Sequence, residues 1–192
     1  PAASRDGQPD QGAVPGWRWD ASGPGDTDGG AVRTPGRAKP AGRPAFDRHV
    51  PAGGYAWWYI DALSDDGRHG LTLIALIGSV FSPYYARARR RGKPEPEQHV
   101  ALNVALYGDG GKRWSMTERG SGALERSAEQ LTIGPSQLHW EDDCLVIDID
   151  EVTVPWPGRL RGQVRLQAPF LSSRVFSLDA RGLHQWQPVA PR

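Results

Sequence analysis

The sequence predicts an all-β fold, an antiparallel sandwich or up-and-down barrel of short strands, with one short helix and a disordered tail. Two segments, Val100–Tyr107 and Leu160–Ala168, alternate apolar and polar side chains, which is typical of strands with one buried face. Groups of Gly, Asp and Ser recur between such segments at short intervals, as turns do. The signals that start and stop a helix occur together in one stretch, which begins at Pro83.

Residues 1–45 differ in composition from the rest of the chain. They are rich in Gly, Pro, Asp, Arg and Ala and have almost no Val, Leu, Ile or Phe. Such a segment buries too little apolar surface to offset the entropy lost on ordering. We therefore expect residues 1–45 to be a disordered tail and residues 46–192 to form the β domain.

The first predicted hairpin carries the densest aromatic cluster of the chain. Tyr55–Asp61 is rich in aromatic residues and predicts a strand, and Asp65-Asp66-Gly67 predicts the turn that follows. The returning strand, within Arg68–Val80, is apolar on both faces, so we expect both of its faces to be buried.

One short helix is predicted after this hairpin. Ser82 suits the N-cap, Pro83 suits the first helical position and Gly92 follows the last helical residue. The helix spans Tyr84–Arg91 and ends in basic residues, which favour the negative end of the helix dipole.

The rest of the domain reads as successive antiparallel hairpins. We expect no strand in residues 187–192, which hold two prolines. The expected strands are Val100–Tyr107, Lys112–Glu118, Ala123–Arg126, Gln130–Ile133, Gln137–Trp140, Cys144–Val152, Leu160–Ala168 and the two arms of a hairpin within Phe176–Trp186.

Composition excludes several classes of function. A net charge of +1 gives no reason to expect nucleic acid as a partner, and a single cysteine excludes an intrachain disulfide. The longest apolar run, Leu71–Phe81, is too short to span a bilayer as a helix. The five histidines are scattered without metal-ligand spacing, so no metal site is predicted. We expect a cytoplasmic protein.

The aromatic residues of the first strand are the candidate binding residues. Tyr55, Trp57 and Tyr59 alternate onto one face, and Trp58 lies on the other. Aromatic walls suit a long apolar or conjugated ligand and stabilise a carbocation by cation–π attraction. The alternative is ordinary core packing by large side chains.

Two carboxylates, Asp61 and Glu118, lie at the ends of predicted strands with an aromatic residue nearby. Asp61 is the better candidate for a catalytic acid. A carboxylic acid in an apolar pocket has a raised pKa and can donate a proton. Asp148 and Asp150 also share a face. For these two we favour cross-strand ion pairs with Arg161 and Arg165 over a paired-carboxylate site.

The helix is a candidate for contact with a membrane surface or with substrate. Tyr84 and Tyr85 open it, and arginines attract anionic headgroups at about 1 kcal/mol each. The arginines of this patch are Arg87, Arg89, Arg90 and Arg91. The alternative is a helix end with solvated cations.

The segments 53–92, 99–108, 113–120, 131–166 and 184–191 together resemble the carotenoid 1,2-hydratases, or hydroxyneurosporene synthases, of phototrophic purple bacteria. The resemblance runs from about Val50 to Pro191. It implies an enzyme that adds water to the terminal double bond of acyclic carotenoids such as neurosporene or lycopene. It also implies a lipocalin-like β architecture, with no redox cofactor and no metal.

The resemblance also implies site residues. The family's His-x-Trp pair matches His184 and Trp186. Its Tyr-x-Asp pair, whose Asp is the favoured acid, lies further along the family's chain than Arg192, so we expect an incomplete member lacking its C-terminal part. The alternatives are a non-catalytic lipocalin-like module that binds an apolar ligand, such as a carotenoid, and an aromatic-rich sandwich that binds carbohydrate.

Overall fold

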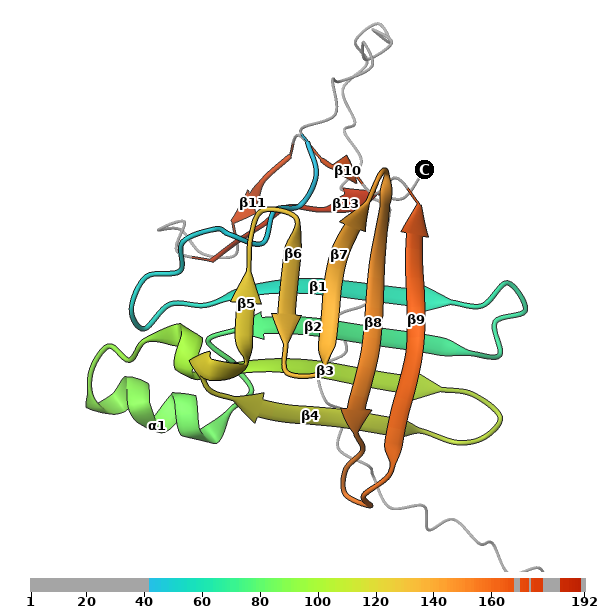
Figure 1. The fold of residues 1–192 in the computed structure, drawn as a ribbon, viewed down its shortest axis with the longest axis horizontal. Helices are drawn as coiled ribbons and strands as arrows, with labels where there is room; N and C mark the ends of the chain where they lie inside the picture. The colour runs from blue at the N-terminus through green and yellow to red at the C-terminus, as the bar shows by residue number, and fades with distance from the viewer. Residues whose placement is uncertain (1–41, 168–169, 173, 178–183, 191–192) are drawn as a thin grey trace, which may run out of the picture. The chain divides into compact units, whose positions relative to one another are not determined.

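The computed structural model describes residues 42–167, 170–172, 174–177 and 184–190. Most of these residues form antiparallel strands in two main sheets (Figure 1). Of the predicted tail, all but residues 42–45 lie outside the described residues.

Sheet A contains four strands in the order β1-β2-β3-β4. Each strand pairs with the next in an antiparallel register, as expected for successive hairpins. The strands are β1 (Ala56–Leu63), β2 (Gly70–Ile77), β3 (Val100–Tyr107) and β4 (Arg113–Arg119).

Sheet B contains five strands in the order β5-β6-β7-β8-β9 and is also antiparallel throughout. Its strands run across those of sheet A in Figure 1, as in orthogonally packed sheets. They are β5 (Leu124–Arg126), β6 (Gln130–Ile133), β7 (Ser136–Glu141), β8 (Cys144–Val152) and β9 (Arg159–Gln167).

The two sheets share one hydrophobic core, which confirms the predicted all-β sandwich. Sheet A contributes the alternate residues of β2 and β3, and sheet B contributes those of β6, β7 and β8, to the same cluster. The strands form two separate sheets, so the sandwich is the architecture found. Each fully buried Leu or Ile stabilises this core by about 1.5–3 kcal/mol.

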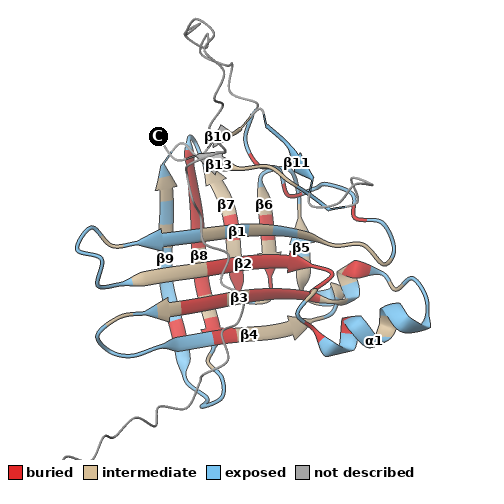
Figure 2. Ribbon diagram, turned by 180° about the vertical axis from the view of Figure 1, so that it is seen from behind, coloured by how far each residue is buried: buried red, intermediate tan, exposed pale blue. Residues whose placement is uncertain are grey.

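Strand β2 is buried on both faces, as its sequence predicts. Leu73, Ala75 and Ile77 face sheet B, whereas Ile74 and Leu76 belong to a second cluster on the opposite face of sheet A. Figure 2 shows this second face, with the centre of β2 and β3 buried. The alternation of β2 thus gives sheet A two apolar faces, one inside the sandwich and one outside it.

A buried ion pair joins the sheets. Glu151 of β8 is 1% exposed and accepts hydrogen bonds from Arg119 of β4 at 2.8 Å and from Ser136 of β7 at 2.9 Å. Removing one partner of such a pair leaves an uncompensated buried charge, which costs about 3–5 kcal/mol.

Helix α1 (Pro83–Arg91) confirms its predicted capping. The Ser82 side chain accepts from the backbone N–H groups of Tyr84 and Tyr85, and Pro83 occupies the first turn. Before the helix, Gly78 has φ +70°, and a Cβ there would lie 2.5 Å from the carbonyl oxygen of Gly54. Glycine therefore allows the chain to leave β2 and bring residues 79–82 back over sheet A.

The C-terminal residues form two small pairs of strands. β11 (Phe176–Ser177) pairs with β12 (Gln185–Trp186), which confirms the predicted hairpin; its turn lies outside the described residues. β10 (Phe170–Leu171) pairs with β13 (Val189–Ala190), so the prediction of no strand in residues 187–192 was wrong. Prolines flank these residues but do not occupy them, so both backbone N–H groups remain to pair.

Two 3₁₀ turns complete the described elements, η1 (Pro96–Gln98) and η2 (Ser121–Ala123). α1 is nine residues long, and no helix in the described ranges is long and apolar enough to cross a bilayer.

Candidate functional site

The face of sheet A that points away from sheet B carries three of the predicted site residues, Trp57, Tyr59 and Asp61. We call it the outer face. By strand alternation and register it holds Trp57, Tyr59 and Asp61 of β1, Thr72, Ile74 and Leu76 of β2, Ala101, Asn103 and Ala105 of β3, and Trp114, Met116 and Glu118 of β4.

Large aromatic side chains of this face are open to solvent. Trp57 is 39% exposed, Tyr59 45% and Trp114 39%. The Trp114 indole N–H donates to the Oδ1 of Asn103 at 2.6 Å, which holds the ring over β3. Partly exposed aromatic side chains thus lie on both edge strands of the outer face, β1 and β4.

The strand register places the two candidate carboxylates at opposite corners of the outer face. Glu118 lies in one row with Trp57, through Leu76 and Ala101, whereas Asp61 lies in one row with Trp114. Three strand spacings and four residues separate the corners, or roughly 20 Å. The two groups are therefore too far apart to act on one double bond.

Asp61 lies on the exposed edge strand and accepts two hydrogen bonds. Tyr59 Oη donates to one of its oxygens at 2.7 Å, and Thr72 Oγ1 donates to the other at 2.5 Å. Partial burial, followed by the bond to Asp61, raises the pKa of Tyr59 to about 12, so this hydroxyl stays a donor at neutral pH. Both oxygens of Asp61 thus act as hydrogen-bond acceptors.

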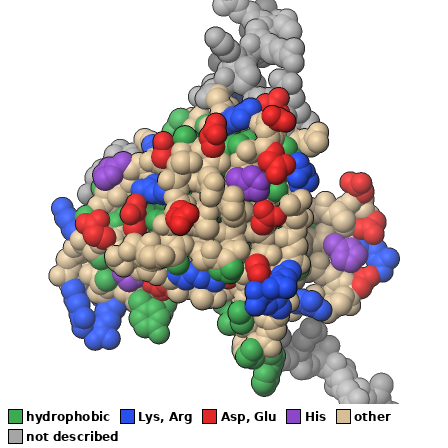
Figure 3. All heavy atoms as spheres, in the orientation of Figure 1, with side chains coloured by type: hydrophobic (Ala, Val, Ile, Leu, Met, Phe, Trp, Pro, Cys, Tyr) green, Lys and Arg blue, Asp and Glu red, His purple; other side chains and the backbone are tan. Residues whose placement is uncertain are grey.

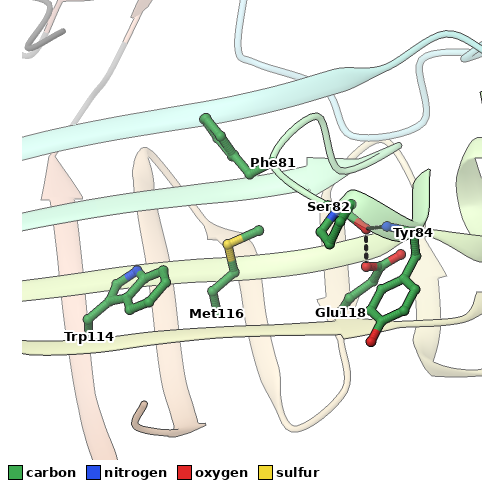
Figure 4. A pocket seen from close by; sticks show the side chains of 7 residues that line it. Phe81, Ser82, Tyr84, Trp114, Met116 and Glu118 are labelled. Carbon is green, nitrogen blue, oxygen red and sulfur yellow. Dashed lines mark hydrogen bonds between the residues drawn. The ribbon is translucent and has the colours of Figure 1, made fainter. Parts of the chain in front are cut away.

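A pocket of about 290 Å³ opens on the outer face where α1 begins. Figure 4 shows Trp114, Met116 and Glu118 following one another along β4. Its lining residues are Phe81, Ser82, Pro83, Tyr84, Trp114, Met116 and Glu118. The lining is mostly aromatic and apolar, with a single carboxylate.

Glu118 is held by two neighbours. His99 Nδ1 lies 2.5 Å from Oε1 of Glu118, and Ser82 Oγ donates to Oε2. The side chains of His99 and Glu118 are only 17% and 19% exposed. The start of α1 also lies beside Glu118, and a helix N-terminus favours negative charge.

His184 lies beside the first aromatic residue of the cluster. Its Nδ1 hydrogen-bonds to Tyr55 Oη, and the two rings stack with centroids 5.5 Å apart. The centroids of the Tyr55 and Trp57 rings are 5.3 Å apart, so Tyr55 connects His184 to the aromatic row of β1, by which we mean Trp57 and Tyr59. Asp61 lies six residues further along, about 20 Å away in an extended strand, so His184 and Asp61 are not brought together.

Three other predicted site residues lie elsewhere. Trp186 stacks on Phe176 with ring centroids 4.7 Å apart. Trp58 faces the sandwich and packs against Phe46 at 5.3 Å. Tyr85 is 1% exposed, and its hydroxyl donates to the carbonyl oxygen of Gly54. Trp58 packs toward the inside of the sandwich and Tyr85 is buried, so their predicted substrate contacts have no support, whereas Tyr84 lines the pocket.

The acidic residues of sheet B form ion pairs, as favoured from the sequence. Asp150 accepts from Arg159 at 2.5 Å and from Arg161 at 3.0 Å. Arg165, in contrast, pairs with Glu141 at 2.8 Å rather than with Asp148. The hydrogen bonds from the two arginines hold the pKa of Asp150 far below its usual range.

No pattern in the sequence indicates that His99 belongs to a site. His99 and Glu118 are 19 residues apart and meet because β3 and β4 pair antiparallel. For three other pocket residues the sequence does contain an indication. Trp114, Met116 and Glu118 alternate along one predicted strand, so they are expected to share one face. No group of three His, Cys, Asp or Glu side chains within the described ranges is arranged to hold a metal ion.

Exposed aromatic side chains and a pocket lined by one carboxylate lie on the outer face of sheet A. In the comparison with known proteins, the model of the carotenoid hydratase CrtC family matches residues 73–192. The chain belongs to this family. The resemblance found in the sequence is thereby confirmed.

Two similar curated proteins are named acyclic carotenoid 1,2-hydratase. An acyclic carotenoid 1,2-hydratase of Thiocapsa roseopersicina is 55% identical over 189 residues, covering 98% of this chain and 47% of that protein. Another of Rubrivivax gelatinosus is 57% identical over 152 residues, covering 78% and 37%. The chain thus spans about half the length of the curated relatives it matches. Comparison with solved structures gives no significant match.

Proposed function

We propose that the chain, as part of an acyclic carotenoid 1,2-hydratase, adds water to the terminal double bond of a carotenoid such as neurosporene or lycopene. The observation that carries the proposal is the outer face of sheet A, where partly exposed aromatic side chains lead to a pocket with one carboxylate. The names of its relatives from Thiocapsa and Rubrivivax support the same reaction.

The outer face has the chemistry that a carotenoid requires. A long conjugated chain gains most of its affinity from apolar burial, and Trp57, Tyr59 and Trp114 offer large flat surfaces for it. A pocket of about 290 Å³ is at the small end of ligand sites, so it suits one end of a long substrate. The rest of the carotenoid would then lie along the aromatic row.

The reaction needs an acid, a stabilised cation and one water. Protonation of the less substituted alkene carbon gives a tertiary cation, which aromatic faces stabilise by about 0.5–2 kcal/mol each. Water then adds to the cation and loses a proton. In this proposal no step needs a cofactor.

We also propose the catalytic roles that the sequence predicted for His184, Trp186 and Asp61. The contact of His184 with Tyr55 supports a place beside the aromatic row. Asp61 as the acid has weaker support, because it lies on an exposed edge and both of its oxygens accept hydrogen bonds.

We also propose residues 46–192 as a β domain that contacts the membrane peripherally on its cytoplasmic side. Figure 3 shows Lys and Arg side chains gathered at the end where α1 lies, and Arg87, Arg89, Arg90 and Arg91 are exposed. Trp156, in the β8–β9 turn, is 83% exposed, and Trp side chains favour the membrane interface. A bilayer is where an apolar substrate accumulates.

The activity test uses a chimera. This chain replaces the matching segment of the Thiocapsa roseopersicina relative, and the chimera is incubated with lycopene in detergent beside the chain alone. We expect a hydroxylated product from the chimera, detected by mass spectrometry, with the unaltered relative as the positive control.

The alternative function is a module that binds carotenoid without chemistry. A chimera that is folded and shifts the absorption of lycopene, but yields no hydroxylated product, would support this alternative and reject the hydratase. A folded chimera that does neither rejects both.

The membrane contact is tested by flotation with vesicles of phosphatidylcholine containing phosphatidylserine. Replacing the four arginines by glutamine should reduce vesicle binding by up to roughly 1,000-fold, at about 1 kcal/mol per arginine. Undiminished binding would rule out this basic patch as the contact.

A further inference from the structure

The ring of His184 is held by the side chain of Tyr55. Nδ1 of His184 hydrogen-bonds to Tyr55 Oη, and the two rings stack with an interplanar angle of 24°. The two residues are 129 positions apart, and Tyr55 is half-buried whereas His184 is exposed. The contact therefore joins a side chain that a ligand can approach with one that the fold restrains.

The backbone that leads into Tyr55 is fixed on two sides. Gly53 N–H donates to the carbonyl oxygen of Pro94 at 2.7 Å. The carbonyl oxygen of Gly54 accepts from the hydroxyl group of Tyr85, which is 1% exposed. Strand β1 begins directly after Tyr55. Tyr55 thus lies between an anchored turn and a strand, which suits a residue that orients another.

The backbone beside His184 is also anchored. β12 begins at the next residue and pairs with β11. Within this pair, Trp186 stacks on Phe176 with ring centroids 4.7 Å apart. These contacts fix the main chain, whereas the rotation of the imidazole ring depends on side-chain contacts such as the one with Tyr55.

The Tyr55–His184 pair lies at the end of the outer face where the pocket opens. The ring of Tyr55 contacts that of Trp57, and Trp57 lies in one row with Glu118, which lines the pocket. Three strand spacings, or roughly 15 Å, separate the two ends of this row. An acyclic carotenoid is longer than this distance, so one molecule can reach both the pocket and the surroundings of His184.

The hydrogen bond also decides which nitrogen of the ring carries the proton. In a neutral imidazole one nitrogen donates and the other accepts. An unprotonated imidazole nitrogen is a better acceptor than a phenol oxygen, so Tyr55 Oη donates and Nδ1 of His184 accepts. The proton of the ring then lies on Nε2, which makes Nε2 a hydrogen-bond donor.

We infer that Tyr55 is a positioning residue of the hydration: its hydroxyl group sets the rotation and the tautomer of His184, whose Nε2–H then donates to the oxygen of the water that adds. The inference rests on the proposed function and adds to it the role of His184 and the residue that orients it. Lycopene and neurosporene are hydrocarbons, so water is the only reactant with an oxygen atom to accept this bond.

The step balances with the substrate and one water. One lone pair of the water oxygen forms the C–O bond to the tertiary cation, while Nε2–H of His184 donates to the other lone pair. The proton that the water loses returns to the acid that protonated the alkene. His184 neither gains nor loses a proton, so both groups end as they began.

Nitrogen NMR of the isotope-labelled chain tests the hydrogen bond without any activity. At about pH 8, above the ordinary range of histidine titration, Nδ1 of His184 should give the signal of an unprotonated nitrogen and Nε2 that of a protonated one. The chain has five histidines, and His184→Ala assigns the signals by removing them. Tyr55→Phe removes the hydroxyl group and keeps the ring, so it should shift the Nδ1 signal. Tyr107→Phe, at the last residue of β3, is the matched control and should leave it in place.

The activity test compares variants of the chimera described above. Tyr55→Phe should lower kcat for lycopene roughly 10- to 100-fold, the cost of a misplaced reacting group, with KM nearly unchanged because the ring stays. Tyr107→Phe should keep full activity. A role of Tyr55 in binding alone would instead raise KM and leave kcat unchanged. Melting curves check that each variant is folded.

A double-mutant cycle tests whether Tyr55 acts through His184. A residue that acts only through another loses its effect once the other is removed. His184→Ala should lower kcat at least as much as Tyr55→Phe, and adding Tyr55→Phe to His184→Ala should lower it no further. His184→Gln should recover part of the activity lost in His184→Ala, because its side-chain amide also donates a hydrogen bond.

The outcomes separate the inference from the proposed function. An active chimera in which Tyr55→Phe keeps its kcat, or in which Tyr55→Phe has the same effect with and without His184, overturns the inference and leaves the hydratase standing. A proton on Nδ1, an Nδ1 signal that Tyr55→Phe does not shift, or a His184→Gln chimera no more active than His184→Ala also overturns it. An inactive unmutated chimera rejects the proposed function itself.

Discussion

Replacing Ser82 by alanine tests whether the start of α1 and the pocket depend on one hydroxyl group. Ser82 is 2% exposed, accepts two backbone N–H groups of the helix and donates to Glu118. Loss of an N-cap costs about 1 kcal/mol, and loss of a hydrogen bond to a charged group costs about 1.5–3 kcal/mol. We therefore expect Ser82→Ala to lower the free energy of unfolding by about 3 kcal/mol.

The assay is urea unfolding followed by tryptophan fluorescence, with thermal melting beside it. For a domain of this size, 3 kcal/mol corresponds to a melting temperature lower by roughly 6–12 °C. Ser79 provides the matched control, because it is fully buried three residues earlier and its Oγ has no hydrogen-bond partner among the described residues. Ser79→Ala removes a buried hydroxyl group without a partner, so it should leave the free energy of unfolding unchanged or raise it by about 1–3 kcal/mol.

The reasoning would be refuted by two results. One is a loss below about 0.5 kcal/mol for Ser82→Ala, which would mean that neither the cap nor the bond to Glu118 contributes. The other is an equal loss for Ser79→Ala, which would attribute the effect to the space filled by a buried side chain rather than to its hydrogen bonds.

Two further predictions concern the two sheets. Trp57→Ala on the outer face should weaken lycopene binding severalfold more than Asp148→Ala on sheet B, measured by absorption titration; equal effects would count against an aromatic binding face. Arg159 and Arg161 lower the folded-state pKa of Asp150, so its contribution to stability is present above about pH 4 and lost as the pH falls further. Asp150→Asn should therefore flatten the decline in urea midpoint below pH 4, and an unchanged decline would show that this carboxylate is not responsible.

Local features of the fold were predictable because their causes lie within a few residues. Ser82 and Pro83 specify the start of α1 through one hydroxyl group and one fixed φ angle, and both positions are confirmed. The β1–β2 hairpin follows from its turn residues and from the apolar side chains on both faces of β2. The pairing of β10 with β13 was not predictable, since two-residue strands have no periodicity of their own.

The candidate site was only partly predictable. The sequence placed Tyr55, Trp57 and Tyr59 on one face and Trp58 on the other, but both faces are aromatic or apolar, so it could not say which one packs inside. The structure packs Trp58 against Phe46 on the inner face and leaves Trp57 on the outer face. Which face packs inside depends on where sheet B lies, and the strand sequence does not contain that information.

The sequence by itself determined an all-β chain, the capped helix after β2, the aromatic content of β1 and a resemblance to carotenoid hydratases. Only the tertiary structure decided that Glu118, His99 and Ser82 meet at one pocket and that Asp61 lies at the far corner of the same face. The physical reason is that alternation and capping act between near neighbours. Contact between residues 19–36 positions apart instead requires the register of β3 on β4 and the return of residues 79–82 over the sheet.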